Sequence, residues 1–401
     1  VKPLNYFTSN ECDQRVPVFY TASTNSQGER KNVMLFILES FSYAYLDPTN
    51  KQKPSTPFFD SLITHSTLYT KAFANNITSA QGLCSMLSGL PSLINQPFFG
   101  SAYANHQVDA IAIQLGKLGY STHFAMGANE DHFGFKKGTK LLGIQHYYNG
   151  EEFPTNQHDG TWGIFDEPFL QHYAALNQQF KQPFFSTLFT ISSHYPFKVP
   201  DSLQGKFPTV HHTQNEQAIS YVDYSFRKYF ERIQKEPWFQ HTIFIFTGDH
   251  VSKENEFEQF NFYSYYHIPI FIFDPQNPEG RTENKLVQHT DLPATIADLS
   301  EMNLPVLSFG HSFYDTTSYR YTVNRYAENI IQLIDENYLI QYDVNQHKML
   351  QAYTHHENDS LLIVKQANIL DQIKKKQIPI LQAYLQQYFN RLYENKLSTR
   401  R

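Results

Sequence analysis

The sequence predicts an α/β protein in which a mostly parallel central sheet carries helices on both faces. The first observation is a set of short, continuous apolar runs bounded by polar turns, which is typical of strands buried on both faces. The second is that helical segments separate these runs, as they do in a doubly covered parallel sheet. The third is a change of texture near residue 316, beyond which we predict a small C-terminal α+β subdomain.

The expected elements follow in order along a catalytic domain that we place at 31–315. Buried strands are expected within 32–40, 121–126, 183–191, 242–247 and 267–273. Helices are expected at 57–74, 79–88, 107–118, 166–181, 215–235 and 288–300. In the C-terminal subdomain, 316–401, short antiparallel strands over 319–349 precede a helix over 366–395. Residues 1–30 are polar and irregular, and we expect them to form a leader wrapped on the core or a linker.

The composition bounds the class of protein. Hydrophobic residues make up 41% and charged residues 17%, which excludes a disordered chain. The net charge of -6 gives no reason to expect a nucleic-acid partner. No apolar run is long enough for a membrane span, and the abrupt start at Val1 leads us to expect that a membrane anchor was removed. Cys12 and Cys84 allow one disulfide, although the apolar surroundings of Cys84 favour a buried thiol.

Two adjacent hydroxyls, on Thr78 and Ser79, precede an apolar run that ends at Gly89 and Pro91. This pattern predicts a short helix in which Thr78 and Gln81 form a capping box and Ser79 is the first helical residue. The free N–H groups of a helix N-terminus favour a phosphate group. On this stretch alone, each hydroxyl is either an ordinary cap or a nucleophile, and the cap is the commoner case.

Further polar residues follow the predicted strands, and we expect them at the same edge of the sheet as the Thr78–Ser79 pair. They are Glu39, His194, Asp249 and His250. Each has a structural alternative, such as a strand terminator, a packed loop histidine or a plain turn. Together, carboxylates, an imidazole and a hydroxyl suit one divalent cation, Mn²⁺ or Zn²⁺ with Mg²⁺ as a further option. Such a cation activates a hydroxyl and neutralises charge on a phosphoryl group.

These residues and their surroundings resemble the alkaline phosphatase/sulfatase superfamily, in the branch of the lipoteichoic acid synthases and phosphoglycerol transferases. The resemblance covers about residues 31–315 and rests on an ordered set of motifs. They are Glu39 after its strand, Thr78-Ser79 with Ser88-Gly89-Leu90-Pro91, Gly248-Asp249-His250, His267-Ile268-Pro269, Gln288-His289-Thr290-Asp291-Leu292-Pro293 and, more weakly, Trp162-Gly163.

The resemblance implies roles for single residues. The metal ligands are Glu39, Asp249 and His250, together with the nucleophilic hydroxyl. Many relatives carry this hydroxyl ten residues before the Gly of the Ser-Gly pair, which here is Ser79, with Thr78 as the close rival. The substrate-binding candidates are His194, His132, Lys136, Trp162 and His267, of which His132 or Lys136 would replace an Arg found in lipoteichoic acid synthases.

The resemblance also implies a function, with two departures. Sulfatases carry Cys or Ser followed by x-Pro-x-Arg, whereas Ser79 is followed by Ala80-Gln81-Gly82-Leu83. Phosphoethanolamine transferases usually contain several disulfides, and two cysteines argue against that subgroup. We therefore expect an extracytoplasmic, membrane-anchored bacterial enzyme of the cell envelope. It would move phosphoglycerol from a phospholipid to a glycan or lipid-glycan acceptor through a covalent phospho-enzyme. The alternatives are a phosphoethanolamine transferase, a phosphodiesterase or phosphatase of the same fold, and an inactive member that binds a surface polymer.

Overall fold

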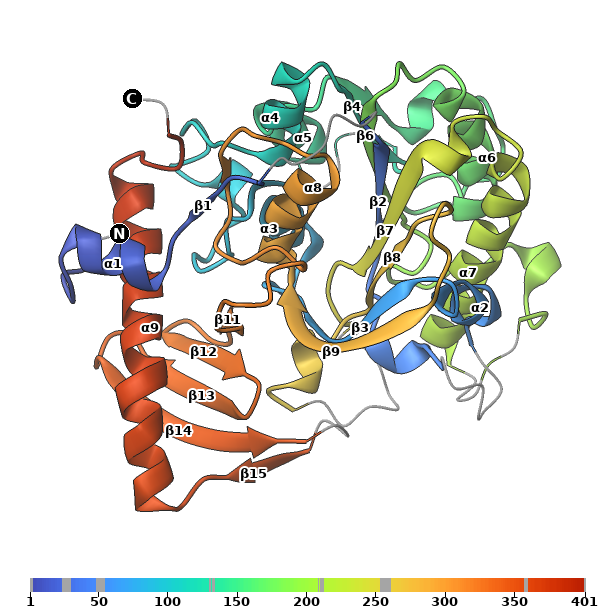
Figure 1. Cartoon of the computed structure of the whole chain (residues 1–401). Coiled ribbons are helices and arrows are strands. Elements are labelled where there is room, and N and C mark those ends of the chain that lie inside the picture. The colour runs from blue at the N-terminus through green and yellow to red at the C-terminus, as the bar shows by residue number, and fades with distance from the viewer. Residues whose placement is uncertain are drawn as a thin grey trace.

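A large mixed sheet and a smaller antiparallel sheet form the two halves of the fold (Figure 1). The computed structural model describes residues 3–23, 30–47, 55–129, 131, 134–207, 209, 213–252, 261–356 and 360–399. Within the described residues, the large sheet has eight strands in the order β5-β4-β6-β2-β7-β8-β3-β9. Its strands are β2 (Asn32–Leu38), β3 (Thr67–Phe73), β4 (Ser121–Met126), β5 (His146–Tyr148), β6 (Phe184–Phe189), β7 (Thr242–Gly248), β8 (Ile270–Phe273) and β9 (Arg281–Gln288).

The strand directions confirm the predicted mostly parallel sheet. β2 pairs in parallel with both β6 and β7, and β4 pairs in parallel with β5 and β6. β8 alone runs against its neighbours, because it pairs antiparallel with both β7 and β3. The carboxyl ends of the central strands therefore meet at one edge of the sheet.

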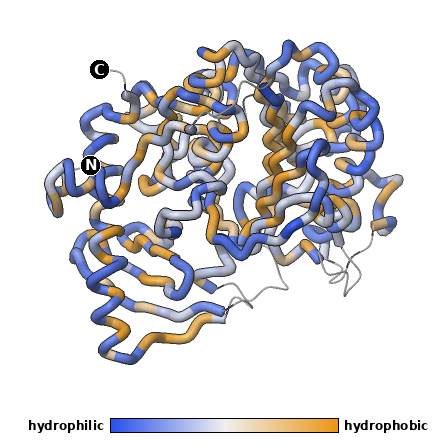
Figure 2. Tube along the Cα trace, in the orientation of Figure 1, coloured by the Kyte–Doolittle hydropathy of each residue, from blue (hydrophilic) through white to orange (hydrophobic). Residues whose placement is uncertain are grey.

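Helices cover both faces of this sheet, as predicted. Along β2, Val33, Leu35 and Ile37 belong to one hydrophobic cluster, while Met34, Phe36 and Leu38 belong to another, since successive side chains of a strand point to opposite faces. The central strands are accordingly the most hydrophobic part of the trace in Figure 2. The first face is covered by α3 (Ser79–Ser88), α4 (Ile111–Lys117) and α8 (Leu292–Leu299). The second is covered by α2 (Pro57–Ile63), α6 (Asp166–Asn177) and α7 (Gln214–Ile233).

Some expected elements differ from the structure. The helix predicted at 57–74 is wrong beyond residue 63, where the chain turns and enters β3. The segment Thr67–Phe73 is rich in β-branched and aromatic residues, which favour a strand. β9 escaped prediction because its first half is polar and largely exposed. A further short helix, α5 (Phe135–Leu141), lies beside β4 (Figure 1).

The C-terminal part forms a separate five-stranded antiparallel sheet whose strands follow chain order. They are β11 (Tyr321–Arg325), β12 (Ile330–Asp335), β13 (Tyr338–Asp343), β14 (Lys348–His355) and β15 (Leu361–Ile363). The long helix α9 (Ala367–Tyr393) runs alongside this sheet and meets α1 (Ser9–Arg15), so the leader wraps on the C-terminal helix (Figure 1). The short strands β1 (Phe19–Tyr20) and β10 (Val306–Leu307) pair antiparallel.

Two further features concern the state of the cysteines and the length and hydrophobicity of the helices. Cys12 and Cys84 are both free and buried, as the apolar surroundings of Cys84 suggested. Among the residues that the structure describes, none of the helices combines the length and the apolar character that a bilayer crossing requires.

Candidate functional site

Glu39 and Asp249 meet because the strands that precede them are neighbours. β2 and β7 pair in parallel register with Leu38 opposite Gly248, and each carboxylate residue follows directly. The N–H of Asp249 donates to Leu38 O at 3.0 Å, and the N–H of Glu39 donates to Thr190 Oγ1 at 2.9 Å. The backbone of both residues is therefore fixed by the sheet, which holds two buried carboxylates at one edge.

Asp249 is fully buried, and only one of its two oxygens is hydrogen-bonded. Its Oδ1 accepts from the backbone N–H groups of Ser40 and His250, both at 2.7 Å, whereas its Oδ2 has no hydrogen-bond partner. Burial, followed by the negative charge of Glu39, raises the pKa of Asp249 above its usual range. A buried carboxylate oxygen without a donor is costly unless a cation faces it.

Ser79 begins α3 and points into the same place. Its hydroxyl donates to Glu39 Oε2 at 2.9 Å and lies 3.4 Å from His250 Nε2. Ser79 is only 4% exposed, whereas Thr78 is exposed. The left-handed backbone of Gly89 (φ 64°) ends the helix, as the sequence predicted.

The predicted capping box is wrong. Thr78 is the N-cap residue, but its side chain makes no cap hydrogen bond. Its backbone oxygen instead accepts from the N–H groups of Gln81 and Gly82, at 3.1 and 3.0 Å, while the exposed side chain lines the cavity in front of Ser79. Sequence alone did not show that the hydroxyl would face the cavity rather than the helix end.

Asn76 and His289 hold this arrangement together, and the sequence pattern assigned a role to neither. The amide nitrogen of Asn76 donates to Thr78 O and to Asp249 O, both at 3.0 Å. His289 is fully buried, with Nε2 2.8 Å from Gly248 O and Nδ1 3.1 Å from Asn76 Oδ1. The two residues connect the start of α3 to the end of β7. A side chain that serves backbone groups leaves no periodic signal, so Asn76 does not stand out in the sequence, and His289 appears there only within the motif at 288–293, without a role of its own.

The side chains of Glu39, Asp249 and His250 form a possible metal site. One ligand atom from each lies within 4.8 Å of the others. The Nδ1–H of His250 donates to Val251 O at 3.0 Å, so Nε2 keeps the lone pair that a metal requires. Asp249 Oδ2, which has no hydrogen-bond partner, lies 3.4 Å from this Nε2, and the donor set fits one divalent cation of the Mn²⁺ or Zn²⁺ type.

A cavity of about 430 Å³ opens in front of these residues. Glu39, Thr78, Ser79, His194 and His250 are among the residues that line it. The ring of His194 lies 4.3 Å from that of Trp162, whose Nε1–H donates to Tyr195 O at 2.7 Å. The predicted substrate-binding residues His194 and Trp162 are thus in contact with each other, and His194 lines the cavity.

Two further substrate-binding candidates, His267 and Lys136, are not among the described residues that line the cavity. His267 is buried, with its ring stacked on Tyr43 and its Nε2 2.8 Å from Thr70 O, and it is not among the described residues that line the cavity. Lys136 is exposed on α5, and its positive charge acts on Glu152. His132 lies outside the described residues.

The amino-acid sequence of this chain is similar to those of several known proteins. The family model described as sulfatase matches residues 31–302. A lipoteichoic acid synthase-like protein of Bacillus subtilis, YvgJ, is 24% identical over 228 residues, which are 55% of this chain and 37% of that protein. A lipoteichoic acid synthase of Staphylococcus aureus is 25% identical over 267 residues, or 62% of this chain and 39% of that protein. The chain therefore spans less than half the length of these curated relatives.

Solved structures agree in fold over nearly the whole chain. A protein of the alkaline phosphatase superfamily from Vibrio parahaemolyticus superposes with a TM-score of 0.81 at 19% identity, covering 100% of this chain and 95% of that one. A lipoteichoic acid synthase from Listeria monocytogenes superposes with a TM-score of 0.79 at 17% identity, covering 96% and 98%. At these identities the likeness shows the fold.

Proposed function

The chain belongs to the sulfatase family, and from this premise we propose that it is a metal-dependent transferase that moves a phosphoglycerol group from a phospholipid to an acceptor hydroxyl. The observation that carries the proposal is the Ser79 hydroxyl, buried at the N-terminus of α3 and hydrogen-bonded to Glu39 beside the possible metal site. The distant relationship to lipoteichoic acid synthases supports a phospholipid donor and a glycan or lipid-glycan acceptor. We place the reaction at the extracytoplasmic face of a bacterial membrane, in agreement with this relationship.

The proposed reaction has two displacements at one phosphorus atom. Ser79 Oγ attacks the donor phosphorus, the bond to the diacylglycerol oxygen breaks, and the serine proton ends on the released diacylglycerol. An acceptor hydroxyl then displaces Ser79 and returns a proton to it. A divalent cation held by Glu39, Asp249 and His250 supplies charge neutralisation at the phosphoryl oxygens and favours the ionised serine hydroxyl. His194, which lines the cavity, would contact a free phosphate oxygen.

The surroundings of Ser79 argue against sulfate ester hydrolysis. Four residues after Ser79, where the sulfatase motif has an Arg, this chain has Leu83, which is fully buried in the apolar core. A guanidinium group there would be a buried charge without a partner. A hydrolase that transfers the phosphoryl group to water remains the second candidate, because the same Ser79 and cation would serve it.

Diacylglycerol release tests the proposal. We expect the protein with Mn²⁺ to release diacylglycerol from phosphatidylglycerol in mixed micelles, faster than from phosphatidylethanolamine. Ser79→Ala should lower this rate by at least about a thousandfold, because it removes the nucleophile. Faster release from phosphatidylethanolamine would make the protein a phosphoethanolamine transferase. Cleavage of a simple phosphomonoester without release from either lipid would favour the phosphatase.

A further inference from the structure

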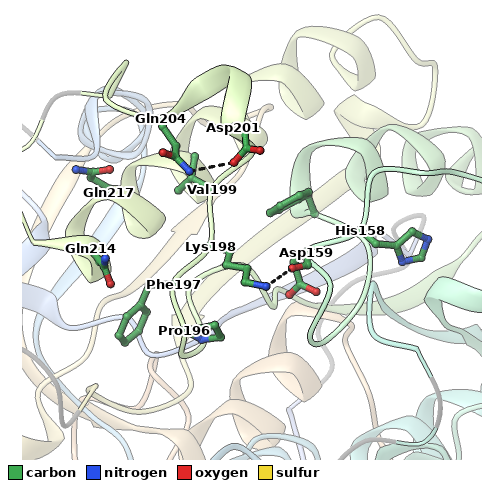
Figure 3. A pocket seen from close by; sticks show the side chains of 11 residues that line it. His158, Asp159, Pro196, Phe197, Lys198, Val199, Asp201, Gln204, Gln214 and Gln217 are labelled. Atoms are coloured by element: carbon green, nitrogen blue, oxygen red, sulfur yellow. Dashed lines mark hydrogen bonds between the residues drawn. The ribbon is translucent and has the colours of Figure 1, made fainter.

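A second cavity, of about 550 Å³, adjoins the cavity in front of Ser79, which we call the catalytic cavity. We name the second one the glutamine cavity (Figure 3). Phe197 lines both cavities, so the two are neighbours across a single side chain. The volume lies within the range of roughly 300–1,000 Å³ that is usual for small-ligand sites. A molecule in the glutamine cavity would therefore lie next to the place where the phospho-enzyme forms.

The lining of the glutamine cavity suits a neutral molecule with many hydroxyl groups. Seven of the eleven described residues that line it are polar or charged, which makes the cavity unsuitable for an acyl chain. Three of them, Gln204, Gln214 and Gln217, carry amides, which both donate and accept hydrogen bonds. Gln214 and Gln217 come from the first turn of α7, on the left in Figure 3. Aromatic and apolar residues, Phe165 and Phe197 among them, complete the wall and offer surfaces for the C–H faces of a sugar.

The charges in this lining argue against an anionic ligand. The described part of the lining contains two carboxylates, Asp159 and Asp201, one ammonium group, Lys198, and the imidazole of His158. That ammonium group donates to Asp159 O at 2.7 Å, and Asp201 Oδ1 accepts from Gln204 Nε2 at 3.1 Å (Figure 3). A phosphate site would instead be expected to gather several cationic or N–H donors. The charge balance thus favours a neutral polyhydroxylated ligand over a second phosphate.

Hydrogen bonds connect residues that line the glutamine cavity to residues near the cavity in front of Ser79. Asp159 is buried, and its Oδ1 accepts from the backbone N–H groups of Thr161, Trp162 and Gly163 at 2.7–3.0 Å. This turn presents Trp162, which bonds Tyr195 O two residues before Phe197. Phe197 itself has a left-handed backbone (φ 58°), which is uncommon for a side chain other than glycine. Strain of this kind is retained where the surroundings enforce it, often at functional sites.

We propose that the glutamine cavity is the acceptor subsite and holds a sugar or glycerol unit of the acceptor beside the phospho-enzyme. The identification of the ligand as the acceptor rests on the proposed function, whereas the binding of a neutral polyol is inferred from the cavity alone. Gln214 and Gln217 would bind hydroxyl groups of the ligand, and Phe197 would separate the acceptor from the donor until transfer.

Binding is tested directly by saturation-transfer NMR with maltose and glycerol as probes. We expect both probes to bind the wild-type protein. The double variant Gln214→Ala/Gln217→Ala should bind maltose about tenfold more weakly, as follows from the loss of one or two hydrogen bonds. Alanine suits both helical positions, so the fold should survive. Gln372→Ala, at an exposed position of α9, is the matched control and should bind like the wild type.

The outcomes separate this inference from the proposed function. Equal binding of maltose by the double variant, no binding of either probe by the wild type, or binding of inorganic phosphate that the double variant loses would each overturn the subsite. In a second arm, phosphatidylglycerol and maltose are incubated with each protein, and phosphoglycerol-maltose is measured against diacylglycerol. We expect this ratio to fall in the double variant. Absence of diacylglycerol release by the wild type would refute the proposed function while leaving the binding result to decide on the cavity.

Discussion

At the scale of single residues, the arrangement of carboxylates in the possible metal site would destabilise the folded protein if no metal were bound. Asp249 is completely buried beside Glu39, and one of its oxygens has no donor. Two carboxylates this close repel each other, which is the second cause of the raised pKa of Asp249 after burial. A cation between them would offset both the repulsion and the missing hydrogen bond. Without a cation the arrangement therefore lowers the stability of the folded protein, as is common for groups at active sites.

The first prediction concerns Asp249→Asn, which keeps the shape of the side chain and removes its charge. The wild type should gain about 2.7 kcal/mol of unfolding free energy when Mn²⁺ is present at a hundred times its dissociation constant. The variant should gain almost none. In EDTA the variant should be the more stable of the two, because the repulsion with Glu39 is gone. Urea denaturation with and without Mn²⁺ measures both effects.

The control for this prediction is Asp371→Asn, an exposed carboxylate on α9. It should bind Mn²⁺ and respond to it like the wild type. If Asp249→Asn retained the full Mn²⁺ stabilisation and metal content, Asp249 would not be a ligand.

The second prediction distinguishes Ser79 from Thr78. Ser79→Ala should abolish formation of the covalent phospho-enzyme, because its hydroxyl is the one beside Glu39. Thr78→Ala should keep the phospho-enzyme and change stability by no more than about 0.5 kcal/mol, since the exposed Thr78 side chain makes no cap hydrogen bond. Intact-protein mass spectrometry after mixing with phosphatidylglycerol measures the adduct. A stable Thr78→Ala protein without an adduct would exchange the two roles.

At the scale of elements, a buried carboxylate joins two helices on the same face of the sheet. Asp223 lies on α7, and its two oxygens accept from the N–H groups of Phe58 and Phe59 at the start of α2, at 3.0 and 2.8 Å. Burial raises the pKa of Asp223 to about 8, with a smaller contribution from the negative charge of Asp60. This contact positions α2, whose Phe59 packs under the central strands.

The third prediction is the pH dependence that follows from Asp223. Its pKa is higher in the folded protein than in the unfolded chain, so the folded state binds more protons and the free energy of unfolding falls as pH rises towards 8. Asp223→Asn cannot titrate. It leaves one N–H without an acceptor, at a pH-independent cost of about 1–3 kcal/mol. The unfolding free energy of the wild type should thus fall relative to that of Asp223→Asn between about pH 6.5 and about pH 8.5.

Urea denaturation at several pH values measures this difference, with Asp371→Asn as a control that should show none. The window lies above the pKa of Asp60, which burial raises to about 6. A difference in unfolding free energy between the two proteins that stays constant with pH would mean that the two N–H donors keep the Asp223 carboxylate ionised throughout.

At the scale of the whole molecule, most of the sheet and the convergence of the site could be predicted from sequence. Apolar runs such as that of β2 mark buried strands, and parallel strands place their carboxyl ends at one edge. For this reason the proximity of Glu39, Ser79, Asp249 and His250 could be predicted from the sequence. β9 could not be found, because its composition is that of a loop and only its pairing with β3 makes it a strand. The roles of Asn76 and His289 depend on long-range contacts with backbone groups, which no local pattern records.

The two ends of the described chain are joined by a small set of amide hydrogen bonds. Gln386 of α9 is buried, and its Oε1 accepts from the N–H groups of Tyr6 and Phe7 at 2.6 and 3.0 Å. Its Nε2 donates to Phe7 O at 2.7 Å. The segment so held continues into α1, where Cys12 is only 2% exposed. The leader thus serves as a strap across the C-terminal helix.

The last prediction follows from this strap. Gln386→Ala would leave two backbone N–H groups and one carbonyl oxygen without their partner and should lower the unfolding free energy by about 1–3 kcal/mol. Because the loss is local, the strap should open before the core does, and the Cys12 thiol should react with a thiol reagent faster than the Cys84 thiol, which lies in α3. Gln372→Ala on the same helix should change neither quantity. Unaltered stability together with unaltered labelling of Cys12 would mean that other contacts with α9, such as the Asp13–Arg391 ion pair, hold this segment and that the Gln386 amide bonds do not.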